Sequence, residues 1–354
     1  MKLLTVGALL GAMLLSLISH SALAADYAAK EGDWIARDFR FHTGQVTPEL
    51  RVHYTTLGNP AGEPVLLLHG TGGAGPNFLD DRFAGEMFGP GQPLDASKHF
   101  IILPDAIGHG KSAKPSDGLR MTFPDYNYAD MVQAQHRLLT EGLGIRHVRL
   151  VMGNSMGGME AWVWGVTHPD FMDALVPMAS TPAAMSGRNW VLRRMLMEAI
   201  RRDPAWKGGD YTAQPATVQL ANVFFGFASN GGAIAMQESL PTSAAGDALV
   251  ESSLAAPFTS DANDVLYQFA AARDYDPSEG LERIVAPVLA INSADDERNP
   301  VETGVMERQL KRLPKARLFL IPASAQTLGH GTTRIARLYA HEVAAFLARA
   351  PHRP

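Results

Sequence analysis

Short, mostly apolar stretches alternate along this chain with longer stretches in which apolar residues recur every three or four positions. Near the start, two stretches alternate polar and apolar residues instead, as half-exposed strands do: 37–41 and 50–54. Six short, mostly apolar runs follow, at 65–68, 100–103, 148–152, 174–178, 288–292 and 318–321. Strands of a parallel sheet have this second pattern, because helices cover both of its faces. The pattern predicts an α/β fold built on a mostly parallel eight-stranded sheet.

Helical periodicity follows several of these runs. Helices are predicted at about 128–142, 156–168, 301–313 and 332–348. Between 181 and 283 the rhythm changes, because Met, Trp and Phe are interspersed with Gly, Asn and Ser and no buried strand run occurs. We interpret 181–283 as a helical insertion, here called the lid, between two parts of one core, 25–180 and 284–354.

The first 24 residues differ from the rest. Lys2 is their only charged side chain, 3–18 is a nearly unbroken apolar run, and 22–24 supplies small residues at a cleavage site. This predicts a secretory signal peptide over 1–24, removed after Ala24, and therefore a periplasmic or secreted protein. An uncleaved anchor is the alternative, although the run is short for a membrane span. No later run reaches about 18 apolar residues, so no stable membrane anchor is expected after cleavage.

Charge and composition narrow the function. The formal net charge is -5 and no basic stripe is present, which disfavours nucleic acid as a partner. The absence of cysteine from the sequence excludes disulfides, thiolate metal sites and a cysteine nucleophile. We find neither His-Glu-x-x-His nor Gly-x-Gly-x-x-Gly, so no metal and no nucleotide cofactor is expected. The oligomeric state stays open.

A serine in a glycine-flanked turn is the first candidate for catalysis. The strand run 148–152 leads into Gly153-Asn154-Ser155-Met156-Gly157, and a predicted helix begins directly after it. This is Gly-x-Ser-x-Gly in the strand–turn–helix context that the motif requires. A serine hydroxyl needs a positioned base before it can attack. Ser155 is therefore the predicted nucleophile.

The acid and the base should follow later strands, in the order serine, aspartate, histidine. His330 follows the run 318–321, and Asp295 and Asp296 follow the run 288–292. Loops at the carboxyl edge of a parallel sheet share that edge with the nucleophile. We predict His330 as the base and Asp296, four residues before Pro300, as the acid. Asp295 remains the alternative.

Attack by serine creates an oxyanion that needs backbone donors. One should be the N–H of Met156, directly after the nucleophile, and the other should come from the glycine-rich loop 69–73, where we choose Thr71. A phosphate cradle is the other use of such a loop, but no Lys-Ser/Thr pair follows it.

With these motifs, the chain resembles the α/β-hydrolase superfamily from about residue 37 to 349. More narrowly, it resembles the homoserine O-acetyltransferase-like branch. This second resemblance rests on Asn154-Ser155-Met156-Gly157-Gly158-Met159 with Ala161-Trp162, on His168-Pro169-Asp170-Phe171, and on Asp296 with Pro300 and Gly329-His330. The resemblance implies an acyl-serine whose acyl group passes to an amino-acid hydroxyl.

Two features depart from that branch. Its members usually carry an aspartate directly after the catalytic histidine, where it can pair with a substrate ammonium group, but this chain has Gly331. The expected export is also at odds with acetyl-CoA as a donor. We therefore expect a secreted serine hydrolase that cleaves small-molecule carboxylic esters. The alternatives are an acyltransferase of the branch and a non-catalytic binding member of the fold.

The lid carries the remaining candidates. Its Met, Trp and Phe side chains suggest an apolar acyl-binding wall, although for most of them packing onto the core is the simpler role. Arg188, Arg193 and Arg194 form a basic cluster that is suited to a substrate carboxylate. A solvated helix face is the explanation that we expect for this cluster.

Overall fold

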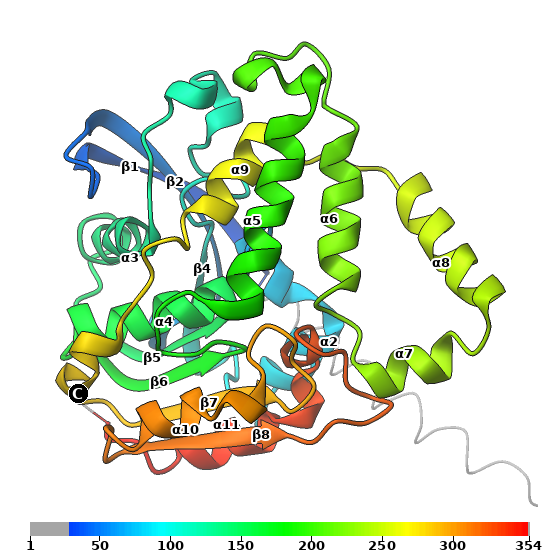
Figure 1. Cartoon of the computed structure of the whole chain (residues 1–354). Coiled ribbons are helices and arrows are strands. Elements are labelled where there is room, and N and C mark those ends of the chain that lie inside the picture. The colour runs from blue at the N-terminus through cyan, green and yellow to red at the C-terminus, as the bar shows by residue number, and fades with distance from the viewer. Residues whose placement is uncertain (1–27, 353–354) are drawn as a thin grey trace, which may run out of the picture.

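The computed structural model describes residues 28–352, and the expected signal peptide at 1–24 lies outside the described residues. Its centre is one eight-stranded sheet (Figure 1). The strands are β1 (Lys30–Arg40), β2 (Val46–Gly58), β3 (Glu63–Leu68), β4 (His99–Pro104), β5 (Val148–Asn154), β6 (Met172–Met178), β7 (Val288–Ser293) and β8 (Ala316–Ile321).

The strand order in the sheet is β1-β2-β4-β3-β5-β6-β7-β8. The pairs β1–β2 and β2–β4 are antiparallel, and every other pair is parallel. Strands β3, β5, β6 and β7 in the middle are buried along almost their whole length. The predicted eight-stranded, mostly parallel sheet is confirmed, and both half-exposed strands lie at its antiparallel edge.

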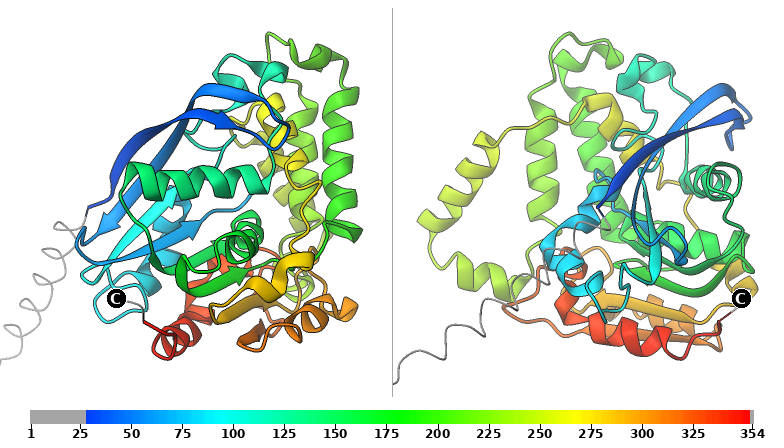
Figure 2. Two further views of the ribbon diagram at one scale, coloured as in Figure 1. Left: turned by 90° about the vertical axis from the view of Figure 1, so that its left-hand side faces the viewer. Right: turned by 180° about the vertical axis from the view of Figure 1, so that it is seen from behind.

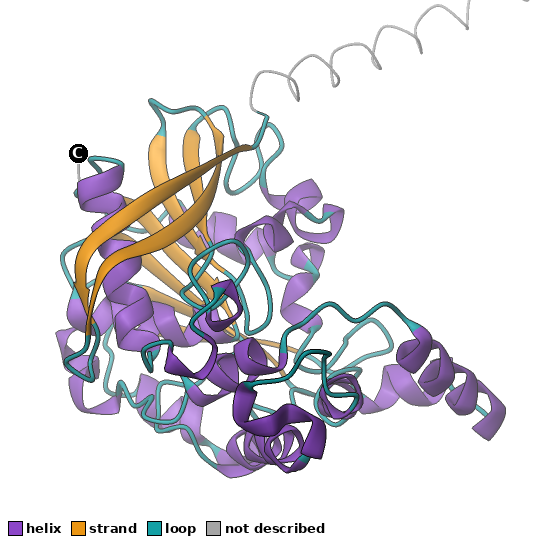
Figure 3. Ribbon diagram, turned by 90° about the horizontal axis from the view of Figure 1, so that it is seen from above, coloured by secondary structure: helices purple, strands orange, loops and turns teal. Residues whose placement is uncertain are grey.

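Helices cover both faces of the sheet, as Figures 2 and 3 show from three further directions. One face packs against α2 (Asp81–Met87) and α11 (Ala340–Leu347). The other face packs against α3 (Tyr128–Arg137), α4 (Met156–Thr167) and α10 (Val305–Leu310). The buried tryptophans Trp162 and Trp164 of α4 fill the layer between that helix and the sheet.

The lid follows β6 and precedes β7. It consists of α5 (Gly187–Arg202), α6 (Thr217–Phe227), α7 (Ala233–Ser239), α8 (Ser243–Ala255) and α9 (Ala262–Ala270), with short 3-10 turns. Helices α5, α6 and α9 share a small apolar core of their own. Helices α7 and α8 bury no residue, and α8 projects from the side of the molecule (Figure 1).

Two predicted helices are shorter than the pattern suggested. The segment 301–313 is divided at Gly304, whose φ of 58° lies in the left-handed region, so α10 begins only at Val305. The segment 332–348 begins with two 3-10 turns before α11. There the Tyr339 hydroxyl donates to the Thr333 carbonyl oxygen, at 2.6 Å, and helps to fold the chain back toward the site.

Within residues 28–352, no helix combines the length and the apolar character that a membrane crossing requires.

Candidate active site

Ser155 occupies a sharp turn between β5 and α4. Its φ of 58° and ψ of −111° are unusual for a residue with a side chain, and such backbone strain is typical of functional positions. The turn requires glycine on both sides. A Cβ at Gly153 would lie 2.0 Å from the carbonyl oxygen of Gly157, and a Cβ at Gly157 would lie 2.0 Å from that of Leu68. The Gly-x-Ser-x-Gly pattern thus has a steric cause.

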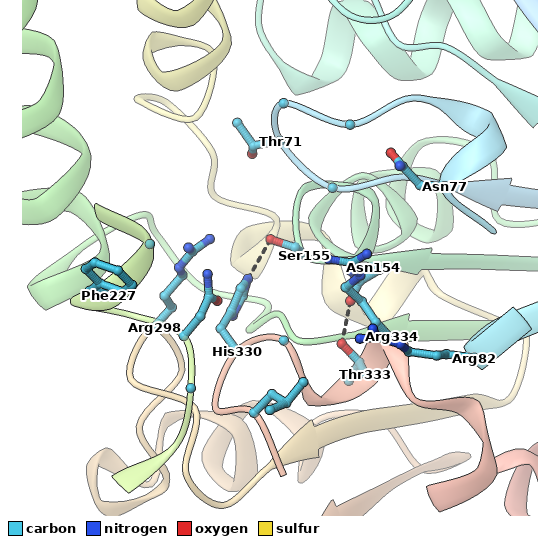
Figure 4. Close-up of a pocket in the computed structure, with 18 of the residues that line it drawn as sticks. Thr71, Asn77, Arg82, Asn154, Ser155, Phe227, Arg298, His330, Thr333 and Arg334 are labelled. Atoms are coloured by element: carbon cyan, nitrogen blue, oxygen red, sulfur yellow. Dashed lines mark hydrogen bonds between the residues drawn. The ribbon is translucent and has the colours of Figure 1, made fainter. Parts of the chain in front are cut away.

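Three side chains from three strand ends form one hydrogen-bonded chain. The Ser155 hydroxyl lies 2.7 Å from Nε2 of His330, as the dashed line in Figure 4 marks. On the other side of the ring, Nδ1 of His330 lies 2.9 Å from Oδ2 and 3.0 Å from Oδ1 of Asp296. All three residues are buried. The geometry is that of a nucleophile, a general base and an orienting acid.

The electrostatics of the site suit a neutral imidazole. Burial lowers the pKa of His330, and the charge of Asp296 opposes this effect only in part. Burial alone would raise the pKa of Asp296. The charge of His330 and hydrogen bonds from His330 and Asn299 outweigh burial and lower that pKa. His330 is therefore free to accept a proton while Asp296 stays ionised.

The two neighbouring aspartates face different partners. Asp296 also accepts hydrogen bonds from the backbone N–H of Arg298, at 2.8 Å, and from Nδ2 of Asn299, at 2.9 Å. Asp295 turns away from His330 and accepts hydrogen bonds from the hydroxyls of Ser293 and Thr327. The structure therefore brings Asp296, and not Asp295, to the imidazole.

The loop after β3 lies directly against Ser155. A Cβ built on Gly70 would be 3.4 Å from the Ser155 Cβ. Thr71 and Ser155 line one cavity (Figure 4). Met156 begins α4, where the first N–H groups of a helix have no acceptor within the helix. Thr71 and Met156 thus lie on the two segments that flank Ser155, the arrangement expected of an oxyanion hole.

Ser155 opens into a cavity of about 780 Å³ between the core and the lid. This volume is in the range typical of small-molecule sites. The lid supplies apolar side chains to it, among them Phe227 and Met236. The charged side chains that line it are Asp80, Arg82, Arg298 and Arg334, three of them cationic. Gly331 also lines the cavity, so the position after the histidine presents no carboxylate there.

The lid is attached to the loops that carry the acid and the base. Asn230 and Gly329 form an isolated β-bridge, and the N–H of Gly231 donates to the Leu328 carbonyl oxygen at 3.0 Å. Nη2 of Arg298 donates to the Ser229 hydroxyl at 2.7 Å. The lid therefore contacts both loops directly, through backbone and side-chain hydrogen bonds.

The three arginines of the basic cluster in the lid differ in their exposure to solvent, which corrects part of the sequence interpretation. Arg188 and Arg194 are solvated side chains, as expected, and they pair with Glu297 and Glu198. Arg193 is fully buried, so a solvated face is the wrong explanation for it. Asn189, Leu196, Met197 and Ile200 are the buried neighbours on its face of α5. The same helical spacing is present in the sequence, and it could have identified Arg193 as a buried residue.

Arg298 is the functional candidate that the sequence analysis missed, because nothing in its spacing separates it from an ordinary loop cation. His69 and His109 lie side by side and buried, 5.2 Å between ring centroids. His69 accepts a hydrogen bond from the N–H of Ala106 at 3.0 Å, which ties the loop after β3 to the loop after β4. Within residues 28–352, no three His, Cys, Asp or Glu side chains are grouped so that they could hold a metal ion.

Comparison with known proteins agrees with the family resemblance that the sequence motifs indicate. Residues 63–327 match the family model described as alpha/beta hydrolase fold. A "Probable acyltransferase" from Methanothermobacter thermautotrophicus is 29% identical over 300 residues, covering 82% of this chain and 90% of that protein. A homoserine O-acetyltransferase from Moorella thermoacetica is 35% identical over 193 residues, so the chain spans about half of that relative, 51%.

The solved structure of an acetylester hydrolase from Corynebacterium glutamicum has a TM-score of 0.77, at 21% identity over 90% of this chain and 96% of that one. That likeness shows the fold alone. The sequence relatives favour the acyltransferase alternative over the ester hydrolase that the sequence analysis placed first.

Proposed function

We propose that this chain, which belongs to the α/β-hydrolase family and to its homoserine O-acetyltransferase-like branch, is an acyl-transfer enzyme that forms an acyl ester on Ser155. The observation that carries the proposal is the continuous hydrogen-bonded chain from Ser155 through His330 to Asp296, at the floor of a cavity that the lid covers. Such a chain is built for covalent catalysis by a hydroxyl.

In the first half of the reaction, Oγ of Ser155 attacks the acyl carbonyl carbon while Nε2 of His330 takes the hydroxyl proton. The tetrahedral oxyanion accepts hydrogen bonds from the N–H groups of Thr71 and Met156. When the intermediate collapses, His330 gives the proton to the leaving group. The acyl group is then esterified to Ser155, and Asp296 has held the imidazole in one orientation throughout.

In the second half, the hydroxyl of an acceptor takes the place of the leaving group, and His330 takes its proton as it attacks the acyl-serine. Collapse of this second intermediate returns the proton to Ser155 and releases the new ester. The comparisons support a hydroxyl acceptor, since two relatives named for acyl transfer match 82% and 49% of the chain.

Water is the second candidate acceptor, and Gly331 is the observation that favours it. An aspartate at this position would pair with a substrate ammonium group, whereas Gly331 presents no charge to the cavity. A charged hydrogen bond contributes roughly 1.5–3 kcal/mol, so its absence weakens amino-acid binding by about ten- to a hundredfold. With water as acceptor the protein is an ester hydrolase.

The test is how the acyl-enzyme partitions. Acetyl-Ser155 is formed from 4-nitrophenyl acetate or from acetyl-CoA, and free acetate and acetyl esters are measured with and without millimolar hydroxyl acceptors, homoserine among them. New ester as the main product supports acyl transfer. Free acetate with every acceptor assigns hydrolysis instead. If a fluorophosphonate fails to label Ser155 at all, both proposals fall and a non-catalytic member of the fold remains.

A further inference from the structure

Asp296 has one side-chain donor besides His330, and that donor is Asn299. Oδ1 of Asp296 accepts hydrogen bonds from two backbone N–H groups, those of Arg298 at 2.8 Å and of Asn299 at 3.3 Å. Oδ2 accepts from Nδ2 of Asn299 at 2.9 Å. Within residues 28–352, no other side chain except His330 donates to this carboxylate. The amide of Asn299 therefore fixes the second oxygen of the acid.

The neighbours of Asn299 fix the orientation of its side-chain amide. Nδ2 also donates to the carbonyl oxygen of Ala179 at 3.0 Å, and Oδ1 accepts from the hydroxyl of Thr181 at 3.0 Å. A rotated amide would place Oδ1 against two oxygens that can only accept. The network therefore permits one orientation, in which the amide nitrogen faces the Asp296 carboxylate.

The end of β6 holds both the nucleophile and the acid. The carbonyl oxygen of Met178, the last residue of β6, accepts from the backbone N–H of Ser155 at 2.9 Å. The next carbonyl, that of Ala179, accepts from Asn299. Ala179 is buried, and its φ of 47° lies in the left-handed region, which is costly for a residue with a side chain. This strained turn directs two successive carbonyls to the segments that carry Ser155 and Asp296.

Asn292 shows what an asparagine with a purely structural role does in the same place. Its Oδ1 accepts from the N–H of Ser180 and its Nδ2 donates to the Ser180 carbonyl oxygen, both at 3.2 Å. Like Asn299, it joins the segment after β6 to β7 and the loop that follows. Unlike Asn299, it makes no hydrogen bond to Asp296 in the described part of the chain. The two asparagines separate bracing of the loop from direct action on the acid.

We propose that Asn299 is a positioning residue of the reaction, which keeps the Asp296 carboxylate aligned with Nδ1 of His330 while the imidazole accepts and returns the proton. The inference rests on the proposed function and holds for either acceptor, water or an alcohol. A donor to a carboxylate stabilises it most when no cation neutralises it. Asn299 therefore favours the neutral imidazole over the protonated one, and its hydrogen bond is among the causes that lower the pKa of Asp296.

The experiment measures kcat, KM and the fall of kcat/KM toward low pH, here called the acid limb, with 4-nitrophenyl acetate. Asn299→Leu roughly preserves the size of the side chain but removes the donor. It should lower kcat by about tenfold and leave KM within about threefold of the original. The His330–Asp296 pair should bind a proton more tightly, so the acid limb should move to higher pH by about one unit.

The acid limb distinguishes positioning from a structural role. The charged groups that act on the pKa of His330 are Asp296, Arg298 and Arg193, and the substitution changes none of them. Loss of a merely structural contact would reduce the fraction of active protein, which fluorophosphonate labelling of Ser155 counts, but would leave the acid limb in place. An unmoved acid limb in labelled Asn299→Leu protein overturns the inference, whatever the loss in kcat.

Two further variants serve as controls. Asn292→Leu is the matched control, and it should lower the thermal unfolding midpoint without moving the acid limb. Asn299→Gln keeps an amide donor on a longer side chain, so its kcat and acid limb should lie between those of the original protein and of Asn299→Leu. Equal movement of the acid limb in Asn292→Leu and Asn299→Leu would mean that bracing of the loop is the cause, and it contradicts the inference.

Thr181→Val covers the case in which Asn299→Leu fails to fold. It keeps the shape of the side chain but removes the hydroxyl that orients the Asn299 amide, so it should move the acid limb in the same direction by a smaller amount. If Thr181→Val is then indistinguishable from the original protein, the inference is overturned. Absent labelling and turnover in the original protein overturns the proposed function and this inference with it. Normal turnover with unmoved acid limbs overturns this inference alone.

Discussion

The core and the lid are built in different ways. In the core, strands β3, β5, β6 and β7 are buried almost completely, and three of them lead directly into loops of the site. In the lid, α7 and α8 bury nothing, and large apolar side chains of α5 and α6 are exposed, among them Val191, Met195, Leu220 and Phe224. The core fixes the geometry of the chain from Ser155 through His330 to Asp296, while side chains of the lid line the cavity beside it.

The two regions also treat buried charge differently. The buried carboxylate of Asp296 in the core is paired with His330 and satisfied by backbone N–H groups. Arg193, which the lid buries, has two guanidinium nitrogens without partners in the described part of the chain. A buried charge that is fully paired stabilises its surroundings only modestly, whereas an unpaired buried charge is costly.

The largest expected effect is on activity, and it comes from changing the nucleophile or the base that the core carries. Ser155→Ala and His330→Ala should each lower kcat on an activated ester by about a thousandfold or more, because either change removes the nucleophile–base pair. Steady-state kinetics measures the loss, and far-ultraviolet circular dichroism should show unchanged secondary structure. Retention of more than a tenth of the activity by a folded variant would show that other residues carry the reaction.

A smaller effect distinguishes the neighbouring aspartates. Asp296→Asn should lower kcat by somewhat less than the serine change, about a hundredfold or more, because an amide no longer stabilises the protonated imidazole. Asp295→Asn, its matched control, should change kcat little, since Asp295 bonds to Ser293 and Thr327 rather than to His330. Greater damage from the Asp295 change would reverse the assignment of the acid.

Stability should separate the two regions in the same way. Leu67→Ala in β3 removes a side chain with no exposed surface, and it should lower the free energy of unfolding by about 2–5 kcal/mol. Leu220→Ala in α6 removes a side chain that is 56% exposed, and it should change that free energy by no more than about 0.5 kcal/mol. Urea denaturation measures both. Equal losses would mean that Leu220 is covered in solution.

The smallest expected effect is a pH dependence. Glu160 of α4 is buried, its Oε1 has no partner among the described residues, and burial raises its pKa to about 8. In the unfolded chain it ionises near its ordinary value, so folding becomes less favourable as pH rises from about 4.5 to 8. Glu160→Gln removes this dependence. Relative to the original protein, the variant should gain about 2 kcal/mol of unfolding free energy between pH 6 and pH 8.

Urea denaturation at several pH values tests this change. Glu198→Gln in the lid is the control, because Glu198 pairs with Arg194 and Arg202 at the surface and should show no such gain. A constant difference between the Glu160 variant and the original protein at all pH values would contradict the raised pKa.

Much of the site could be predicted because its causes are local. The turn around Ser155 needs glycine at 153 and 157 to avoid backbone clashes. The sequence therefore shows the motif between a predicted strand and a predicted helix. His330 follows from the strand order, since loops after parallel strands meet at one edge of the sheet. Period and composition likewise predicted the eight strands and the helical character of the lid, but not the breaks within 301–313 and 332–348.

The sequence by itself therefore determined the fold class, the residue types of the site and their order, because steric and periodic constraints act between near neighbours. Only the tertiary structure decided which of Asp295 and Asp296 faces the imidazole, since one peptide step reverses the direction of a side chain. It also decided that Arg193 is buried beside Tyr128 and near Arg298. Burial and charge pairing depend on segments far apart in the chain, and no local pattern records where those segments meet.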